Sequence, residues 1–258
     1  MELELRGKVV VVTGGSRGIG FACARGFLTE GARVAIVSRH QVNIDRALGA
    51  LAGGIGVAAD LSDAEAAGHM VDRVESALGP IDVLVNCAGA AKRTAPAELL
   101  PATWHAAMDA KYFSYIHAID PVIKRMAARA CGVIVNVIGN GGKIASALHI
   151  PGGSANAALM LATAGLARAY AASGVRVVAV NPGLTNTERV SEGMKVAARL
   201  QGITEAEALQ GSLAAIPMGR MAEPEEIANA VVFLASARAS YITGVSLSMD
   251  GAAAPTVL

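Results

Sequence analysis

The stretch KVVVVTGGSRGIG, residues 8–20, joins a run of valines to a loop rich in glycine. A continuous β-branched run of this kind predicts a strand that is buried on both faces of a sheet. A helical pattern follows and begins near Ile19. Glycines at this place let the backbone approach a pyrophosphate, whose charge is stabilised by the free amides of a helix N-terminus. The stretch therefore predicts a nucleotide-binding strand–loop–helix unit.

Six further short apolar runs, separated by helical patterns, repeat this arrangement along the chain. They are RVAIV (33–37), IGVAA (55–59), IDVLV (81–85), GVIVNVI (132–138), VRVVAV (175–180) and GVSLSM (244–249). The alternation predicts an α/β fold of the Rossmann type, with a doubly wound, mostly parallel seven-stranded sheet and three α/β/α layers. Because we find no internal repeat and no linker, one domain over residues 1–258 is expected.

Two places in the chain have the spacing of a capping box, which predicts the start of a helix. They are Ser62-x-x-Glu65 and Thr204-x-x-Glu207. Glycine at the end of a helical pattern supplies the left-handed residue that stops a helix. Such glycines predict helix ends at Gly31, Gly79 and Gly174.

The composition excludes several classes of protein. The 22 basic and 21 acidic residues give a net charge of +1 without a charged block, so neither nucleic acid nor a membrane is an expected partner. Three irregularly spaced cysteines indicate a reducing compartment, with no disulfide framework and no zinc site. The charged N-terminus and the lack of a long apolar run predict a cytoplasmic protein.

The residues after the second predicted strand bear on the choice of nucleotide. A site for NAD has an acidic residue there, which binds the ribose 2′-hydroxyl. This chain has Ser38 and Arg39 instead, with Arg17 nearby in the glycine loop. Charge-assisted hydrogen bonds from arginine contribute about 1.5–3 kcal/mol each, enough for a tenfold preference for a 2′-phosphate. The prediction is NADP rather than NAD, unless Arg39 only solvates a loop.

The glycine loop also fits a rival reading. Gly14-x-Ser16-x-Gly18 is the pattern of a hydrolase nucleophile elbow, which would make Ser16 a nucleophile. That reading requires an acid and a histidine after later strands. The elbow normally follows a central strand rather than the first strand of the chain.

With these residues in view, the chain resembles the classical short-chain dehydrogenases/reductases along nearly its whole length. TGGSRGIG (13–20), VNCAG (85–89), VNPGLTNT (180–187) and the stretch 219–252 match the family's motifs, and AADLSD supplies Asp60 at the adenine position. The resemblance implies a cofactor site made of Gly14, Ser16, Arg17, Gly18, Ile19, Gly20, Ser38, Arg39, Asp60, Leu61, Asn86, Ala88, Gly89, Asn156, Pro182, Gly183, Thr185 and Thr187.

The family's catalytic positions are all replaced in this alignment. The resemblance places Gly139 at the serine, Gly152 at the tyrosine, Asn156 at the lysine and Lys111 at the asparagine. In the family, the tyrosine gives its proton to the carbonyl oxygen while hydride arrives from the cofactor. Loss of a positioned general acid costs roughly 10²–10⁴-fold in rate, which weakens an enzymatic reading without ending it.

The exchange of lysine and asparagine suggests a rearranged site. Our hypothesis is that Lys111 supplies positive charge and the proton, while Asn156 keeps the hydrogen bond to the ribose. Burial would lower the pKa of Lys111 towards the working range, whereas the alternative is a solvated lysine on a helix. His149, three residues before Gly152, is the other candidate proton donor, unless it is a structural loop residue. No histidines show metal-ligand spacing, so no metal is predicted.

Two further regions concern the substrate and the partners. The resemblance makes residues 186–217 a lid over the substrate, and it makes the alanine-rich stretch 157–172 a pairing helix in a homotetramer or homodimer. An apolar lid suits a small, apolar carbonyl or alcohol, unless its side chains pack only on their own domain. The apolar lid residues are Val190, Met194, Leu200, Leu209, Leu213 and Ile216.

The sequence therefore predicts a short-chain oxidoreductase that transfers hydride between NADP(H) and a carbonyl or alcohol, with an atypical active site. The alternative is a catalytically inactive NADP(H)-binding relative that serves as a sensor or structural partner. Both would keep the same cofactor residues, so those residues do not separate the two functions.

Overall fold

In the computed structural model, which describes residues 2–89 and 92–254, all seven predicted strands are present in one sheet. Every pair of neighbours is parallel, in the order β3-β2-β1-β4-β5-β6-β7. The predicted Rossmann-type fold class is confirmed. The strands are β1 (Val9–Thr13), β2 (Arg33–Ser38), β3 (Ile55–Ala58), β4 (Val83–Asn86), β5 (Gly132–Val137), β6 (Val175–Pro182) and β7 (Ser246–Met249).

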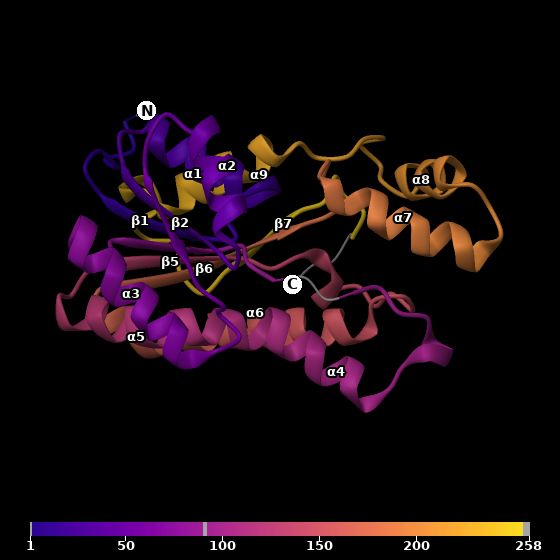
Figure 1. The fold of residues 1–258 in the computed structure, drawn as a ribbon, viewed down its shortest axis with the longest axis horizontal. Helices are drawn as coiled ribbons and strands as arrows, with labels where there is room; N and C mark the ends of the chain where they lie inside the picture. The colour runs from indigo at the N-terminus through magenta and orange to yellow at the C-terminus, as the bar shows by residue number, and fades with distance from the viewer. Residues whose placement is uncertain (1, 90–91, 255–258) are drawn as a thin grey trace.

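Helices cover both faces of this sheet (Figure 1). One layer holds α1 (Gly18–Thr29), α2 (Gln41–Ala50) and α9 (Pro224–Ala235), and the other holds α3 (Ala64–Leu78), α5 (Ser114–Ala128) and α6 (Ile150–Tyr170). No helix in the described part of the chain is both long and apolar enough to cross a bilayer. The short elements are α4 (Pro101–Ala107), the π-helical segment η2 (Met108–Phe113), and 3-10 turns at Pro96–Glu98, Asn140–Gly142, Ala171–Ser173 and Ala237–Ala239.

The valine run of β1 shows why the sequences of the strands are continuously apolar. Val10 and Val12 belong to the core between the sheet and α1, α2 and α9. Val9 and Val11 belong to the core on the opposite face, with α3, α5 and α6. Because both faces are covered, every position of the strand is buried and the period-2 pattern disappears.

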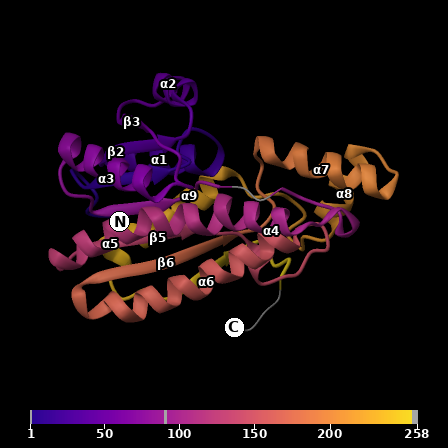
Figure 2. The ribbon, with the colours of Figure 1, turned by 60° about the horizontal axis from the view of Figure 1, so that its bottom comes forward.

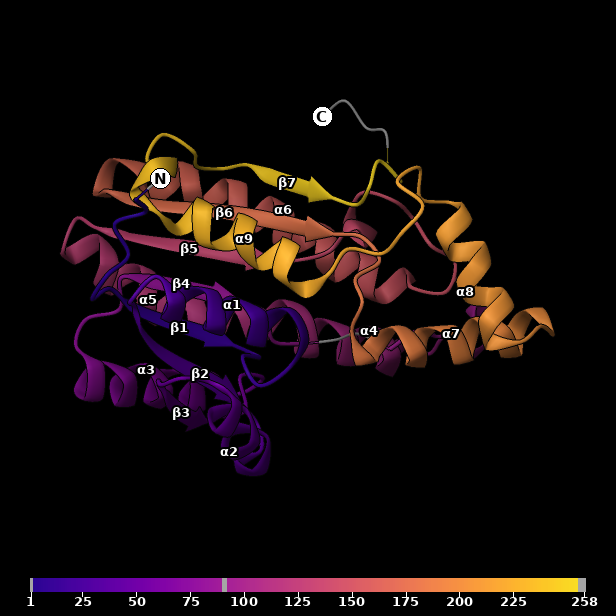
Figure 3. The same cartoon turned by 90° about the horizontal axis from the view of Figure 1, so that it is seen from above.

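The strand order places a crevice at one edge of the sheet. From β1 the chain runs outward to β2 and β3, and then returns to the other side of β1 as β4. In such a doubly wound sheet, ligands bind outside the carboxyl ends of the strands where the order reverses. Figure 3 shows these ends pointing towards α4, α7 and α8.

Two helices lie beyond the carboxyl edge of the sheet and beside each other (Figure 2). They are α7 (Glu188–Gln201) and α8 (Glu205–Ala214), which are the two helical patterns expected within residues 186–217. Met194 and Leu209 belong to a small apolar cluster of these helices, which also contains Leu148. Part of the predicted apolar lid surface is therefore used to pack the two helices together.

The helix ends agree with the sequence in all but one case. Gly31, Gly79 and Gly174 have positive φ, as expected for glycines after helices. The capping box at Thr204 and Glu207 is formed at the start of α8. The box predicted at Ser62 is wrong, because the carboxylate of Asp63 accepts the first-turn amide of α3. The hydroxyl of Ser62 instead donates to Asp60.

Candidate active site

The glycine loop forms a cradle between β1 and α1. A Cβ atom on Gly14, whose φ is 66°, would lie 2.9 Å from the Cα of Ala88, and one on Gly20 would lie 2.3 Å from the carbonyl oxygen of Gly14. Among the described residues, no side chain caps the start of α1 and its first turn holds no acidic residue. Free amides at an uncapped helix N-terminus are a binding site for phosphate groups. The loop therefore fits the pyrophosphate of a dinucleotide.

Ser16 lies in this loop but is not arranged as a nucleophile. Its hydroxyl donates to Oγ of Ser38 at the end of β2, over 3.2 Å. Within residues 2–89 and 92–254, no histidine hydrogen-bonds to Ser16, so no base activates it. The hydrolase reading is wrong for this geometry.

The groups expected to contact the adenosine end lie in the glycine loop and after β2 and β3. Arg17 and Arg39 are both exposed, and Arg17 lies 3.8 Å from the carboxylate of Glu188. Arg39 forms no ion pair with any described residue. Asp60 accepts from the backbone amide and the hydroxyl of Ser62, and these bonds lower the pKa of its carboxyl. Leu61 beside it is buried.

A chain of buried polar side chains ties the ends of the central strands together. Thr13 donates to Oδ1 of Asn86, Nδ2 of Asn86 donates to Asn136 over 3.0 Å, and Nδ2 of Asn136 donates to Thr163 over 3.0 Å. These four residues come from β1, β4, β5 and α6. Asn86 therefore links the ends of β1 and β5, with the oxygen and the nitrogen of its side-chain amide both hydrogen-bonded.

The turn after β4 is fixed by the same threonine. Oγ1 of Thr13 accepts the backbone amides of Cys87 and Ala88, each over 3.2 Å. Gly89, with a φ of 89°, then lies directly against η2, where an added Cβ would be 1.9 Å from the carbonyl oxygen of Ala110. Only glycine permits this approach, which brings the turn beside Lys111.

Lys111 is buried, with 7% of its surface exposed. It lies in the π-helical segment, an irregularity that is frequent at functional sites. Its Nζ donates to the hydroxyl of Tyr115 over 2.7 Å and to the carbonyl oxygen of Val137 over 3.0 Å. The Tyr115 hydroxyl, itself fully buried, donates to the same carbonyl. The alternative that Lys111 is a solvated helix residue is wrong.

Burial changes the titration of this lysine. Desolvation, together with the positive charge of Arg189, lowers the pKa of Lys111 from 10.5 to about 7. The guanidinium of Arg189 does not deprotonate in proteins, so its effect persists at every accessible pH. At neutral pH, Lys111 therefore exists as a mixture of ammonium and amine.

The catalytic positions implied by the sequence meet in one small cavity of about 50 Å³. Asn156 is buried in its wall, and a Cβ on Gly139 would lie 3.4 Å from Nδ2 of Asn156. The four positions that resemble the family's catalytic residues are thus brought together in space. The cavity is lined by Gly89, Lys111, Ile138, His149, Gly152, Asn156 and Arg189.

His149 borders the cavity just before α6 and is half-buried. Its Nδ1 is buried and has no hydrogen-bond partner among the described residues. Desolvation lowers the pKa of His149, and the charges of Arg93, Arg189 and Lys111 lower it further. The imidazole is therefore held neutral at physiological pH.

The segment after β6 closes the crevice opposite the glycine loop. Pro182 ends β6, and Thr185 is buried with its hydroxyl bonded to the carbonyl oxygen of Gly183. Thr187 precedes α7, and its Cγ2 would lie 3.3 Å from a Cβ on Gly18. The Pro-Gly segment and the glycine loop thus face each other across the predicted cofactor site.

Three residues near the cavity were not predicted from the sequence. Arg189 lines the cavity while much of its side chain stays in solvent, Arg93 lies close to His149, and Tyr115 holds Lys111. Arg189 lies two residues after Thr187, a predicted cofactor residue, and its position in the sequence could therefore have indicated that it lies near the site. Tyr115 lies four residues after Lys111 and so shares its helix face.

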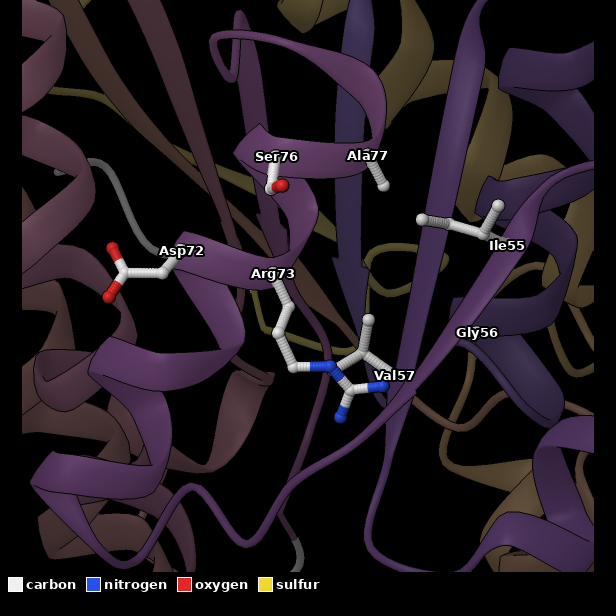
Figure 4. A pocket seen from close by; sticks show the side chains of 7 residues that line it. All are labelled: Ile55, Gly56, Val57, Asp72, Arg73, Ser76 and Ala77. Atoms are coloured by element: carbon white, nitrogen blue, oxygen red, sulfur yellow. The ribbon is translucent and has the colours of Figure 1, made fainter.

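A larger and more open hollow lies between β3 and α3, away from the strand ends (Figure 4). Its wall is formed by Ile55, Val57 and Ala77, with the guanidinium of Arg73 extended towards Val57. Asp72 points away and pairs with Arg125. No converging polar groups suggest chemistry there, so the smaller cavity is the candidate active site.

The other histidines and the acidic residues form no metal centre within the described residues, where no three potential ligands cluster. His40, His69 and His105 are exposed. The Nδ1 atom of His117 lies 3.0 Å from the carbonyl oxygen of Leu61.

Comparison with known proteins places this site in a family context. A family model described as enoyl-(acyl carrier protein) reductase matches residues 14–252. The 3alpha-hydroxysteroid dehydrogenase of Mediterraneibacter gnavus is 35% identical over 98% of this chain and 99% of its own length. Galactitol 2-dehydrogenase (L-tagatose-forming) of Cereibacter sphaeroides is also 35% identical, over 96% of this chain and 95% of its own.

A solved structure agrees with these relatives. L-sorbose reductase from Gluconobacter frateurii, complexed with NADPH and L-sorbose, superposes with a TM-score of 0.92 at 30% identity and covers both chains completely. The sheet order, the glycine loop and these full-length similarities lead to one conclusion: the chain belongs to the short-chain dehydrogenase/reductase family.

Proposed function

We propose that the protein is an NADP(H)-dependent oxidoreductase that transfers hydride between the nicotinamide and a carbonyl or alcohol, with Lys111 handling the proton. The observation that carries this proposal is the buried amine of Lys111, which lines one cavity with Asn156 and has a pKa of about 7. General acid–base catalysis works best with a group that titrates near the operating pH. Gly152 stands at the family's tyrosine position, so another side chain has to supply the proton.

The proposed cofactor site follows the carboxyl edge of the sheet. Arg17 and Arg39 are exposed cations beside Ser38, which suits a 2′-phosphate. The structurally similar L-sorbose reductase has NADPH bound, which favours the same choice here. The residues proposed to surround the cofactor are Gly14, Ser16, Arg17, Gly18, Ile19, Gly20, Ser38, Arg39, Asp60, Leu61, Asn86, Ala88, Gly89, Asn156, Pro182, Gly183, Thr185 and Thr187.

When bound, the nicotinamide supplies or accepts the hydride. In reduction, the C=O π bond breaks and the carbonyl oxygen takes a proton from the Lys111 ammonium, which leaves an alcohol and a neutral amine. Solvent then returns a proton to the amine. In oxidation, the neutral amine takes the hydroxyl proton. Two N–H groups of the ammonium are held by Tyr115 and Val137, so the third is available to the substrate oxygen.

Asn156 and His149 have supporting roles in this proposal. The buried amide of Asn156 is assigned the ribose hydrogen bond that a lysine makes in the family. His149 is assigned a hydrogen bond to the substrate as a neutral imidazole, because its lowered pKa keeps it unprotonated. We assign α7 and α8 the role of the lid within one functional domain.

The substrate in this proposal is a small carbonyl or alcohol. The expectation of an apolar substrate rested on the lid, but Met194 and Leu209 pack between α7 and α8. None of the six apolar lid residues lines the cavity, where Lys111, His149 and Arg189 lie instead. The polarity of the lining thus favours a polar substrate.

A second candidate function is a non-catalytic NADP(H)-binding protein that acts as a sensor or structural partner. It is favoured by Gly139 and Gly152, which leave the serine and tyrosine positions without functional side chains. Turnover of any carbonyl or alcohol would exclude it.

The first test compares NADPH and NADH binding by calorimetry. We expect NADPH to bind at least about tenfold more tightly, since one charge-assisted hydrogen bond contributes roughly 1.5–3 kcal/mol. Arg39→Met should reduce this preference, and the exposed Arg46→Met should leave it unchanged as the matched control. Equal or tighter NADH binding would overturn the cofactor assignment. NADPH binding without NADPH oxidation across a broad carbonyl panel would favour the second candidate.

A further inference from the structure

We infer that the cavity binds a substrate with a carboxylate, namely a small oxo acid or the corresponding hydroxy acid, and that Arg93 and Arg189 hold the carboxylate. This inference rests on the proposed function, because it assigns the substrate class of the same site. It starts from two arginines that no motif of the chain accounts for.

Arg93 and Arg189 approach the cavity from different segments. Arg189 is in the first turn of α7 and lines the cavity directly. Arg93 packs on the same helix one turn later, where its Nε would lie 3.2 Å from a Cβ on Gly193. The backbone next to it is fixed by a hydrogen bond from the Thr94 amide to the carbonyl oxygen of Leu148. This bond places Arg93 beside the loop that carries His149.

The charges around the cavity are unbalanced. Arg93, Arg189 and Lys111 are all close enough to His149 to lower its pKa. No carboxylate lines the cavity within the described residues. Two acidic groups accompany these cations outside the cavity lining: the charge of Glu192 acts on Arg189, and the carboxylate of Glu188 lies 3.8 Å from Arg17. Cations gathered in this way repel one another, and an anion placed among them relieves that repulsion.

The geometry separates this anion from the phosphates of the cofactor. The cradle for phosphate is the glycine loop at the start of α1. Arg189 is close to both Arg17 and Arg93, so it lies between the glycine loop and the His149 loop. Arg93 is therefore on the substrate side of Arg189. It is the residue whose replacement distinguishes a substrate carboxylate from a cofactor phosphate.

The residue types fit a carboxylate better than a neutral oxygen. A guanidinium presents N–H donors in a planar fork that matches the two oxygens of a carboxylate. With a carboxylate held at the α7 side, the carbonyl of a short oxo acid reaches the cavity wall that carries Lys111.

The test measures binding rather than turnover. The protein is saturated with NADP⁺, so that no reduction occurs, and titrated by calorimetry with pyruvate, acetoacetate and 4-oxopentanoate and with the methyl ester of each. For at least one chain length, we expect the acid to bind at least about tenfold more tightly than its ester. Arg93→Met and Arg189→Met should each weaken binding of the acid about tenfold and leave the ester nearly unchanged. Lys195→Met, an exposed cation on the same helix, is the control and should change neither.

Three results would overturn the inference. The first is equal affinity for acid and ester at every chain length. The second is an equal loss of affinity for acid and ester in the arginine variants. The third is weaker NADP⁺ binding in Arg189→Met with an unchanged ratio of acid affinity to ester affinity. The NADP⁺ titration tests the cofactor assignment of the proposed function independently of the anion site. If NADP⁺ does not bind but the acid preference and its dependence on Arg93 remain, the anion site stands and the cofactor assignment falls.

Discussion

At the scale of the residue, the proposed chemistry depends on the ε-amino group of Lys111. Burial costs an ammonium its hydration, and the hydrogen bonds to Tyr115 and Val137 restore only part of it. A pKa near 7 instead of 10.5 corresponds to a preference for the amine on the order of 5 kcal/mol relative to solvent. Burial in this fold thus brings the pKa of the Lys111 amine close to neutral pH.

Lys111 and His149 differ in a way that assigns the proton to the lysine. Both have a lowered pKa, but the ordinary value for histidine is already 6.5. The lowered pKa of His149 therefore leaves little imidazolium at pH 7, whereas the pKa of about 7 leaves Lys111 partly protonated. Only Lys111 combines a transferable proton with a neutral product form at this pH.

At the scale of elements, the hydrogen-bond chain from Thr13 to Thr163 holds the strand ends beneath the site. Thr163→Val keeps the shape of the side chain but removes the acceptor of the Asn136 amide, which is then buried without a partner. We expect the free energy of unfolding to fall by about 1–3 kcal/mol in urea denaturation. Thr29→Val is the matched control, because Thr29 makes the same bond to the carbonyl four residues earlier but is exposed. Equal losses in both variants would show that the chain of bonds adds nothing.

The elements themselves were largely predictable, and the exceptions are informative. All seven strands followed from short β-branched runs because both faces of the sheet are covered. The helix start at Ser62 was misplaced because Asp63, one residue later, competes for the same amide. The π-helical segment at Met108–Phe113 was not predicted, since nothing in DAKYFSY distinguishes it from an ordinary helical turn. Lys111 is the buried residue of that segment.

The candidate site was partly predictable for a related reason. Lys111, His149 and Asn156 were identified from their places in an ungapped alignment, and the structure brings them to one cavity. Arg93 and Arg189 are far apart in the sequence and meet only because α7 folds back over the loop before α4. Such proximity follows from tertiary structure and has no local pattern.

At the scale of the whole molecule, α6 has an exposed face on which the small residues Ala157, Ala164 and Gly165 accompany Leu161, whose surface is 76% exposed. We propose that copies of the chain pair through this helix in a dimer or tetramer. Leu161→Glu should then lower the molar mass measured by light scattering after gel filtration. Val42→Glu, which changes an equally exposed apolar residue on α2, should leave the mass unchanged. A monomeric wild-type protein would contradict the proposal.

The central claim is that Lys111 supplies the proton, and the pH dependence of NADPH-driven carbonyl reduction tests it most directly. The acid must be protonated, so the wild-type rate should be highest below pH 7 and fall as the pH rises above about 7. Lys111→Met should react at least about 100-fold more slowly and bind NADPH as the wild type does, and its rate should not show this bend in the pH–rate profile near pH 7. His149→Ala should keep the bend. A wild-type rate in Lys111→Met, or a wild-type profile that is flat between pH 6 and about 9, would contradict the assignment of the proton to Lys111.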